Sequence, residues 1–187
     1  MLKFLKRVID FINYQESKNS IKKFQKLGKG SSVIYPIEIE YPENFIVEDY
    51  VLIGRNAWIS CYDEVIFKSG TITGPRLKIY TGNHNYDSTI SIPYDHITFA
   101  KKTIIGENVW IGGDVILLPG VELGEGSVVG AGAVVTKSFE PGSIIGGNPA
   151  KLIKKRNMDQ YYDLKEKNKI YLKLKGEKIL TPEIQKS

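Results

Sequence analysis

Apolar residues recur at every sixth position over the centre of the chain. From Ile105 the sequence divides into blocks of six residues, IGENVW, IGGDVI, LLPGVE, LGEGSV, VGAGAV and VTKSFE. The first positions are all aliphatic: Ile105, Ile111, Leu117, Leu123, Val129 and Val135. Glycine follows at the second position in four of the blocks. Amphipathic helices and half-buried strands have apolar periods of 3.6 and 2, so neither explains this pattern.

Six residues are enough for a short strand and a tight corner. One aliphatic side chain of each strand would point inward, and glycine would permit corner conformations that a Cβ opposes. Small or branched residues would fill the space beside the corners at the fifth positions, Val109, Val115, Val121, Ser127, Ala133 and Phe139. Three blocks would complete one triangular turn. The pattern therefore predicts a parallel β-helix, an all-β solenoid with a continuous aliphatic core.

A looser array of the same period comes earlier in the chain. Its first positions are Val47, Ile53, Ile59 and Val65, and its fifth positions include Val51, Ala57 and Ser69. The two arrays are four residues out of phase, so we expect the coil to be interrupted over about residues 82–103. A loop that leaves a solenoid cannot bury its core, and such loops often carry function. This one holds both histidines of the chain, His84 and His96.

The two ends of the chain have a different character. Residues 2–27 alternate apolar and basic residues at helical spacing, and the lysine-rich residues 157–180 predict a second helix. The expected organisation is an N-terminal helical segment over 1–29, a solenoid over 30–155 and a basic helical tail over 156–187. The 187 residues, of which 42% are hydrophobic, are enough for one domain with a core.

Charge is divided unevenly along the chain. Residues 30–150 have a net charge of −7, whereas the two flanks together have +12. We expect no nucleic-acid partner, because basic residues are not organised with aromatics or in a helix-in-groove motif. The basic flanks could contact the phosphates of a cofactor or associate weakly with an anionic membrane surface. A pair of solvated helices that cap the solenoid is the alternative.

The N-terminal segment has no continuous apolar stretch, because Lys6, Arg7 and Asp10 interrupt it. This rules against a signal peptide and a transmembrane span. The single cysteine, Cys61, cannot form an internal disulfide, and we expect it to be a small buried residue. A soluble, cytoplasmic protein is the prediction.

Three stretches of the sequence resemble a known family. They are TGNH, IIGENVWIGGDVILLPGVELGEGSVVGAGAVVTK and GGNPAKLIKKR. They resemble the hexapeptide-repeat acyltransferases with a left-handed β-helix, in the branch of maltose, galactoside, nodulation and polysaccharide O-acetyltransferases. The resemblance covers about residues 45–155. It implies the left-handed coil, acetyl-CoA as the acyl donor, and a homotrimer with the active site between adjacent subunits.

The resemblance also assigns roles to His84 and Gly113. Acetyl transfer from a thioester to a hydroxyl requires removal of the hydroxyl proton, which an imidazole can accept near neutral pH. His84 aligns with the catalytic histidine of the family's TGH-like motif, here TGNH, and the Gly113 amide aligns with the oxyanion donor. The alternatives are a loop histidine that only makes hydrogen bonds and an ordinary corner glycine. His96 matches no motif and is interpreted as a loop residue, with acceptor contact as the alternative.

The same resemblance places acetyl-CoA and its acceptor. Family positions for acetyl-CoA contacts are Trp110, Gly113, Ala131, Thr136, Lys137, Lys151 and Lys154. The small residues among them also suit the repeat, whereas no packing rule requires the lysines, which are candidates for phosphate contacts. The candidate acceptor contacts are Asn83, Asn85, Asp87 and Ser60. Asparagine and aspartate in a loop more often satisfy local turn hydrogen bonds.

The predicted activity is O-acetylation of a carbohydrate hydroxyl, and the sequence leaves the acceptor open. The alternative is N-acetylation of an amino sugar, or an antibiotic or serine acetyltransferase on the same scaffold. A zinc-dependent carbonic anhydrase of this fold would need three histidine ligands, and the chain has two. We therefore expect no metal. A structural solenoid or scaffold without catalytic activity is the remaining alternative.

Overall fold

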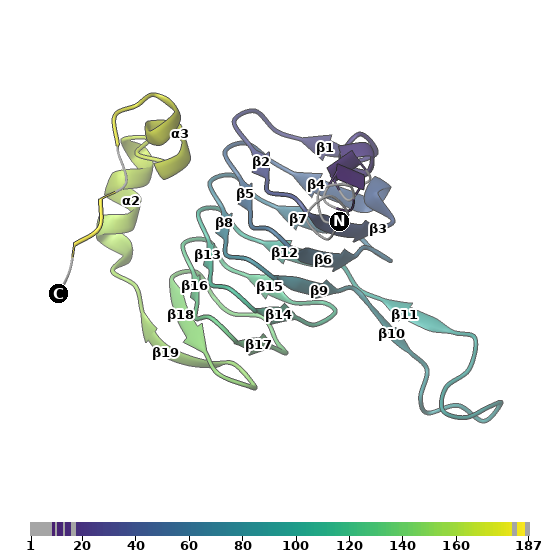
Figure 1. Ribbon diagram of the computed structural model, residues 1–187. Coiled ribbons are helices and arrows are strands. Elements are labelled where there is room, and N and C mark those ends of the chain that lie inside the picture. Colours follow the sequence, from purple (N-terminus) through teal and green to yellow (C-terminus); the bar gives the residue numbers. More distant parts are fainter. Residues whose placement is uncertain (1–8, 10, 13, 16–17, 181–182, 186–187) are drawn as a thin grey trace.

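A computed structural model describes residues 9, 11–12, 14–15, 18–180 and 183–185. Short parallel strands stack into three sheets around a coil (Figure 1). Sheet A contains β1 (Lys26–Leu27), β4 (Phe45–Val47), β7 (Val65–Phe67), β12 (Thr103–Ile105) and β15 (Glu122–Leu123). Sheet C contains β3 (Ile37–Glu40), β6 (Ala57–Ser60), β9 (Lys78–Tyr80), β14 (Ile116–Leu117) and β17 (Val134–Val135).

Sheet B lies between sheets A and C in the order of the chain. It contains β2 (Ser32–Val33), β5 (Leu52–Ile53), β8 (Ile72–Thr73), β13 (Trp110–Ile111), β16 (Val128–Val129), β18 (Ser143–Gly146) and the antiparallel β19 (Lys151–Lys155). The chain passes from A to B to C and back to A, which creates three edges, here called AB, BC and CA. The one short 3-10 helix among the described residues, η1 (Pro42–Asn44), lies at the CA edge.

The core is the aliphatic ladder that the six-residue period predicts. All six first-position residues of the second array are at most 1% exposed. Five of the six fifth-position residues are buried beside them. Phe139 is only partly buried and forms an isolated bridge with Leu123 in place of a strand. The predicted parallel β-solenoid is confirmed, because burial of every sixth side chain is what stacked turns require.

The four-residue offset between the two arrays arises at two places in the chain, so the expectation of one interruption was wrong. Val47 stacks on Phe67, which follows Ile59 by eight positions and not by six. The CA corner over residues 61–64 is therefore two residues longer than a repeat corner. Its backbone is held by hydrogen bonds from Asn44 Nδ2 to the Cys61 carbonyl (2.9 Å) and from the Asp63 amide to Thr81 Oγ1 (3.2 Å).

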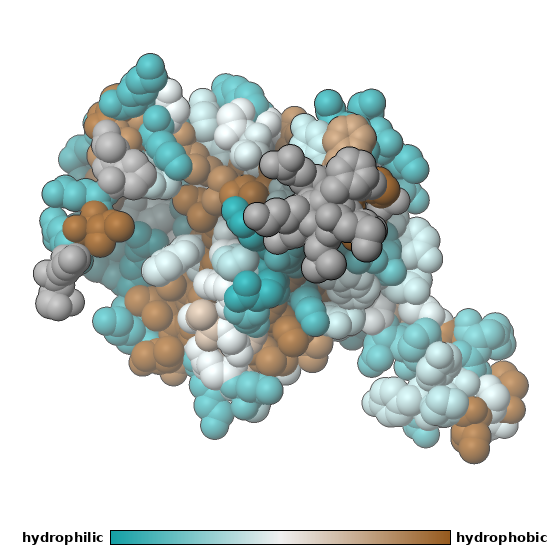
Figure 2. Space-filling model, viewed as in Figure 1, coloured by the Kyte–Doolittle hydropathy of each residue, from teal (hydrophilic) through white to brown (hydrophobic). Residues whose placement is uncertain are grey.

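The second interruption is a hairpin arm that leaves the coil at the CA edge. It contains the antiparallel strands β10 (Gly82–His84) and β11 (Thr98–Ala100) and stands away from the body (Figure 1). Apolar side chains of the arm are exposed, with Ile90 at 69% and Ile92 at 93%. Hydrophobic surface accordingly gathers near the far end of the arm (Figure 2). The arm contributes nothing to the aliphatic ladder of the coil.

The ends of the chain differ from the two long helices that the pattern predicts. Residues 1–8 of the segment expected to be helical lie outside the described residues; the described residues between 9 and 21 are helical. The chain then enters sheet A, because Phe24 packs edge to face on Phe45 at 4.8 Å and the Gln25 amide donates to the Phe45 carbonyl. Among the described residues, no helix has the length and apolar content needed to cross a bilayer.

The C-terminal segment forms two helices, α2 (Met158–Glu166) and α3 (Tyr171–Gly176). Asn168 adopts a left-handed backbone with φ of 53°, and the Lys169 amide bonds back to the Leu164 carbonyl. This bond closes the end of α2, so a single helix over 157–180 was wrong. Lys165 fastens α2 along the AB edge through bonds of 2.8 Å to both Glu107 and Glu125.

Candidate active site

His84 ends strand β10 and is exposed on the hairpin arm. Its imidazole lies flat against the ring of Tyr94, with centroids 4.0 Å apart and an angle of 8° between the planes. Within the described part of the chain, neither ring nitrogen of His84 forms a hydrogen bond. The edge of the ring is therefore free for a substrate, while one face is occupied.

Asp95 ties the two sides of the arm together beside these rings. Asn85 Nδ2 donates to one Asp95 carboxylate oxygen at 2.7 Å, and the Ile97 amide donates to the other at 2.8 Å. The Asp95 amide donates in turn to the Asn85 carbonyl at 3.3 Å. The Ile97 amide and the Ser88 hydroxyl, acting against burial, hold the pKa of the Asp95 carboxyl below its usual value. The Asn85 side chain is thus part of the arm's own framework.

The other two candidate acceptor residues of the arm point into solvent. Asn83 pairs with Phe99 in the β10–β11 ladder, and its side chain is exposed. Asp87 lies in the turn and is exposed as well. Ser60 is different, because it ends β6 at the foot of the arm and is only 3% exposed. Its hydroxyl has no hydrogen-bond partner among the described residues.

Cys61, beside Ser60, is buried as expected and has no disulfide partner. Burial, with smaller contributions from Glu43 and Glu40, raises the pKa of its thiol to about 12. The thiol is therefore protonated at neutral pH and is a poor nucleophile. Its environment agrees with a packing role.

Gly113 lies at the BC edge, in the corner between β13 and β14. Its amide forms no hydrogen bond within the described residues, whereas its carbonyl accepts from the Gly132 amide at 2.9 Å. Gly74, one turn earlier, packs so closely that a Cβ there would lie 2.6 Å from the Gly113 nitrogen. The close packing fixes the corner and leaves the Gly113 amide available as a donor.

A salt bridge lies next to this amide. Arg76 Nη2 donates to an Asp114 carboxylate oxygen at 2.6 Å, and both residues have positive φ angles near 60°. The Arg76 hydrogen bond holds the pKa of the Asp114 carboxyl below its usual value. Both side chains are more than half exposed, so the pair closes the corner at the surface.

The candidate acetyl-CoA contacts fall into four groups. Gly113 and Ala131 lie in consecutive corners of the BC edge, where the Gly112 backbone packs against that of Ala131. Thr136 and Lys137 follow β17 at the CA edge, across the width of sheet C. Trp110 projects from sheet B, 59% exposed, between Ile72 and Val128 of the neighbouring strands.

The remaining two candidates, Lys151 and Lys154, lie on β19 beyond the last turn of the coil. Both are exposed, and Lys151 is paired with Gly146 near the BC edge. A ligand along the BC edge would therefore run from Gly113 past Ala131 towards Lys151. Thr136 and Lys137 would need a ligand that also crosses sheet C, or one held against a second chain.

One chain does not bring His84 and Gly113 together. The arm begins after β9 and returns into β12, so its foot is at the CA edge, whereas Gly113 is at the BC edge. Sheet C lies between the two edges, and the arm projects away from the body (Figure 1). A site that contains both groups therefore requires an arm and an edge from different copies.

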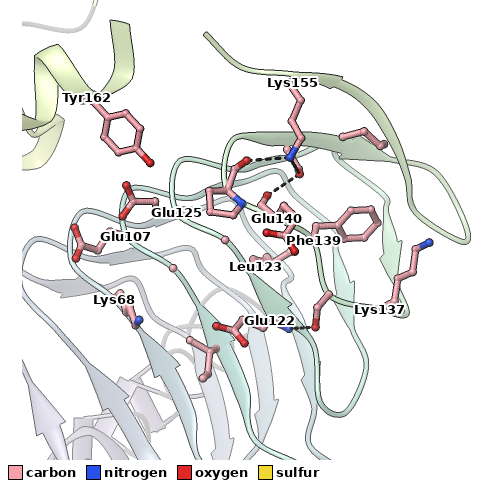
Figure 3. A pocket seen from close by; sticks show the side chains of 17 residues that line it. Lys68, Glu107, Glu122, Leu123, Glu125, Lys137, Phe139, Glu140, Lys155 and Tyr162 are labelled. Carbon is pink, nitrogen blue, oxygen red and sulfur yellow. Dashed lines mark hydrogen bonds between the residues drawn. The ribbon is translucent and has the colours of Figure 1, made fainter. Parts of the chain in front are cut away.

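A groove of about 810 Å³ lies elsewhere, between sheet A, the AB edge and the C-terminal segment (Figure 3). Carboxylates of Glu107 and Glu125 lie towards Tyr162 at one end, and Lys137 is at the opposite end. Burial lowers the pKa of Lys165, but its hydrogen bonds to these two glutamates outweigh that effect and raise the pKa. The two glutamates are thus already neutralised by the protein itself.

Sequence reasoning missed Tyr94 and Asp95. Both belong to the hairpin, where the six-residue period is absent, and neither lies in a stretch that resembles the family. The one available indication was the separation of ten residues between Asn85 and Asp95, which fits a pairing across a loop. No set of three or more His, Cys, Asp or Glu side chains in the described chain is grouped to hold a metal.

Comparisons with known proteins agree with the coil. Residues 102–137 match the family model described as bacterial transferase hexapeptide, six repeats. The provisionally named colanic acid biosynthesis acetyltransferase WcaF of Escherichia coli K12 is 31% identical over 132 residues, covering 70% of this chain and 69% of that protein. A solved galactoside acetyltransferase in complex with coenzyme A has a TM-score of 0.67 and 26% identity, covering 75% of this chain and 70% of that one.

A chloramphenicol acetyltransferase of Klebsiella aerogenes is 41% identical over 101 residues, which are 46% of this chain and 48% of that protein. The chain thus spans about half the length of this relative.

Proposed function

Because this chain belongs to the hexapeptide-repeat transferase family, we propose that it is an acetyl-CoA-dependent O-acetyltransferase that modifies a carbohydrate hydroxyl. The observation that carries the proposal is the exposed imidazole of His84, held on an arm that does nothing for the core. Its ring nitrogens have no partner among the described residues, so they are free to bind a hydroxyl. The name of the galactoside acetyltransferase and its bound coenzyme A support the donor and the acceptor class.

In the proposed reaction His84 acts as general base. Its unprotonated nitrogen takes the proton of the acceptor hydroxyl while the oxygen forms a bond to the thioester carbonyl carbon. The Gly113 amide donates to the oxyanion that develops on the carbonyl oxygen. When the intermediate collapses, the carbon–sulfur bond breaks and the imidazolium returns its proton to the departing sulfur. His84 ends the cycle in its starting state.

We further propose that the site forms between copies of the chain in a homotrimer. The separation of His84 and Gly113 on different edges supports this assembly, because neither group can reach the other within one chain. The BC edge would hold acetyl-CoA, with Gly113 and Ala131 permitting close approach to the backbone. Lys151 and Lys154, and Lys137 from the CA edge, would contact the phosphates. Trp110 and Thr136 would complete this binding surface.

The acceptor would contact the arm. Asn83, on β10, and Asp87, in the turn beyond it, are exposed and can reach a sugar, whereas Asn85 is engaged with Asp95. The buried Ser60 hydroxyl would need a local opening to reach a ligand. A cytoplasmic location follows from the proposed use of acetyl-CoA and stays a prediction.

One observation favours a second candidate acceptor. The chloramphenicol acetyltransferase match has the higher identity, 41% against 31% for the polysaccharide relative. An antibiotic hydroxyl therefore belongs in the same test. An amino sugar should also be included in this test, because a neutral amine can attack the same thioester with a weaker base than a hydroxyl requires.

The test is a screen of acceptors with acetyl-CoA, with free thiol release as the readout. The acceptors are maltose, a galactoside, chloramphenicol and glucosamine. We expect release with a hydroxyl of a carbohydrate, lost by about 10² to 10⁴ in His84→Ala while the melting temperature is retained. Near-normal turnover of folded His84→Ala would remove the proposed base. Release with glucosamine but with no sugar that lacks the amine would replace O-acetylation by N-acetylation.

A further inference from the structure

The imidazole of His84 has one described ring partner, Tyr94, and the contact is face to face. Ten residues separate the two in sequence, and they meet because the hairpin folds them onto each other. A stack of this kind differs from a hydrogen bond in what it leaves free. It occupies the face of the imidazole and leaves both nitrogens, which lie at the edge of the ring, open to substrate.

The backbone around the two rings is fixed independently of them. Asn85 follows His84, Asp95 follows Tyr94, and these two neighbours hold each other through Asn85 Nδ2 to Asp95 Oδ2 (2.7 Å) and the Asp95 amide to the Asn85 carbonyl (3.3 Å). Asp95 is only 5% exposed, although the arm around it is open to solvent. The tie therefore sets the spacing at which the rings face one another.

A base on an exposed arm needs such support. A general base must bring its nitrogen within about 2.6–3.2 Å of the proton-bearing atom. The His84 ring has no hydrogen bond to a described residue that would fix its rotation about the Cβ–Cγ bond. The parallel Tyr94 ring restricts that rotation, because turning the imidazole would separate the two faces.

We propose that Tyr94 is a positioning residue that sets the plane of the His84 imidazole for proton transfer. The proposal rests on the proposed function of His84 as general base. Tyr94 acts through the ring face and not through its hydroxyl. The Asn85–Asp95 tie serves the same end by holding the two strands of the arm in register.

The expected loss of kcat distinguishes the positioning role of Tyr94 from the role of His84 as the base. Aromatic pairs contribute an interaction that corresponds to about 2- to 13-fold in a rate. Tyr94→Leu is therefore expected to lower kcat by that factor, far less than the about 10² to 10⁴ expected for His84→Ala. KM for acetyl-CoA should not change, because Tyr94 lies on the arm and not at the BC edge. Tyr94→Phe keeps the ring and should restore kcat.

A matched control lies on the same arm. Tyr86 is 77% exposed, stacks on no described ring, and meets His84 only through its backbone amide. Tyr86→Leu removes an equally large aromatic group and should leave kcat unchanged. The acceptor in these assays is whichever compound of the screen gives the fastest thiol release.

A second readout reports the stack without turnover. The chain has two histidines, so His96→Gln leaves His84 as the single source of imidazole signals in an NMR spectrum. In that background the His84 ring protons should lie upfield because of the Tyr94 ring current. Tyr94→Leu should remove the shift, Tyr94→Phe should keep it, and Tyr86→Leu should leave it unchanged.

Three outcomes overturn the proposal. If Tyr94→Leu leaves kcat unchanged, the ring does not position the base. If Tyr94→Phe is as slow as Tyr94→Leu, the hydroxyl is responsible and not the ring face. If His84→Ala keeps its turnover, the proposal falls together with the proposed function. In that case the NMR shift tells whether the stack exists without serving catalysis.

Discussion

A methyl group added at Gly74 tests the oxyanion donor from a position that touches no substrate. The new Cβ would lie 2.6 Å from the Gly113 nitrogen, 2.8 Å from the Gly112 carbonyl carbon and 2.9 Å from Gly113 Cα. All three atoms are backbone, so no side-chain rotation can relieve the contact. An ordinary contact begins near 3.4 Å, so the Gly113 corner must move by about 0.8 Å.

The expected loss follows from that displacement. A misplacement of about 1 Å can cost about 10² in rate, so Gly74→Ala should lower kcat by about 10- to 100-fold. The overpacked corner should also lose about 1–3 kcal/mol of unfolding free energy. The assay is the initial rate of thiol release at saturating acetyl-CoA, with the melting temperature measured on the same preparation.

Gly130→Ala is the matched control, two turns further along the same edge. Its Cβ would meet the Ile145 carbonyl oxygen at 3.4 Å and Gly146 Cα at 3.8 Å, both ordinary contacts. It should keep its stability and turnover. The reasoning is refuted if folded Gly74→Ala turns over at the unaltered rate, since a displaced Gly113 amide would then make no difference to the transition state.

Three further predictions follow from other parts of the molecule. Mixed oligomers of His84→Ala and Gly113→Pro, which lacks the backbone N–H, should regain activity at about a quarter of the sites if the site forms between copies; no recovery on co-refolding would place both groups in one chain. Lys165→Met leaves Glu107 and Glu125 unpaired, so amide exchange in α2 and α3 should quicken while the coil stays protected, and an unchanged exchange pattern would mean that apolar contacts alone hold the segment. The pKa of the Asp95 carboxyl is lowered in the folded arm, so its stabilisation of the arm is present above its ordinary pKa of 3.8 and is lost as pH falls through the lower folded value. The upfield shift of the His84 ring protons should therefore fade in that acidic range in the native protein. In Asp95→Asn the shift should not depend on pH there.

Much of the coil could be predicted because its cause is local. Each turn buries a side chain at a fixed step, so Ile111 and Leu117 reveal their burial by spacing alone. The earlier turns were harder, because a corner can lengthen by two residues without disturbing the ladder on either side. Val65 is buried as the spacing suggests, yet Phe67 is the residue that continues the Val47 ladder.

The candidate site also combines features that the sequence predicted with features that it did not. His84 and Gly113 were identified from short stretches that resemble a family, but their separation on different edges depends on how many corners lie between them. Tyr94 could not be found from the sequence, since nothing in the order of residues indicates which ring a hairpin will lay on His84. The end of α2, just before Asn168, was not predicted for a related reason, because the apolar spacing continues past it.

The sequence by itself determined the period, the direction of the buried side chains and the existence of an excursion at His84. These follow from the six-residue step and from the interruption of the repeat, which need no knowledge of distant contacts. Only the tertiary structure decided which edge carries the arm, which ring faces the imidazole and where α2 is fastened. Such contacts join residues far apart in the chain, and their free energies depend on geometry that no local pattern encodes.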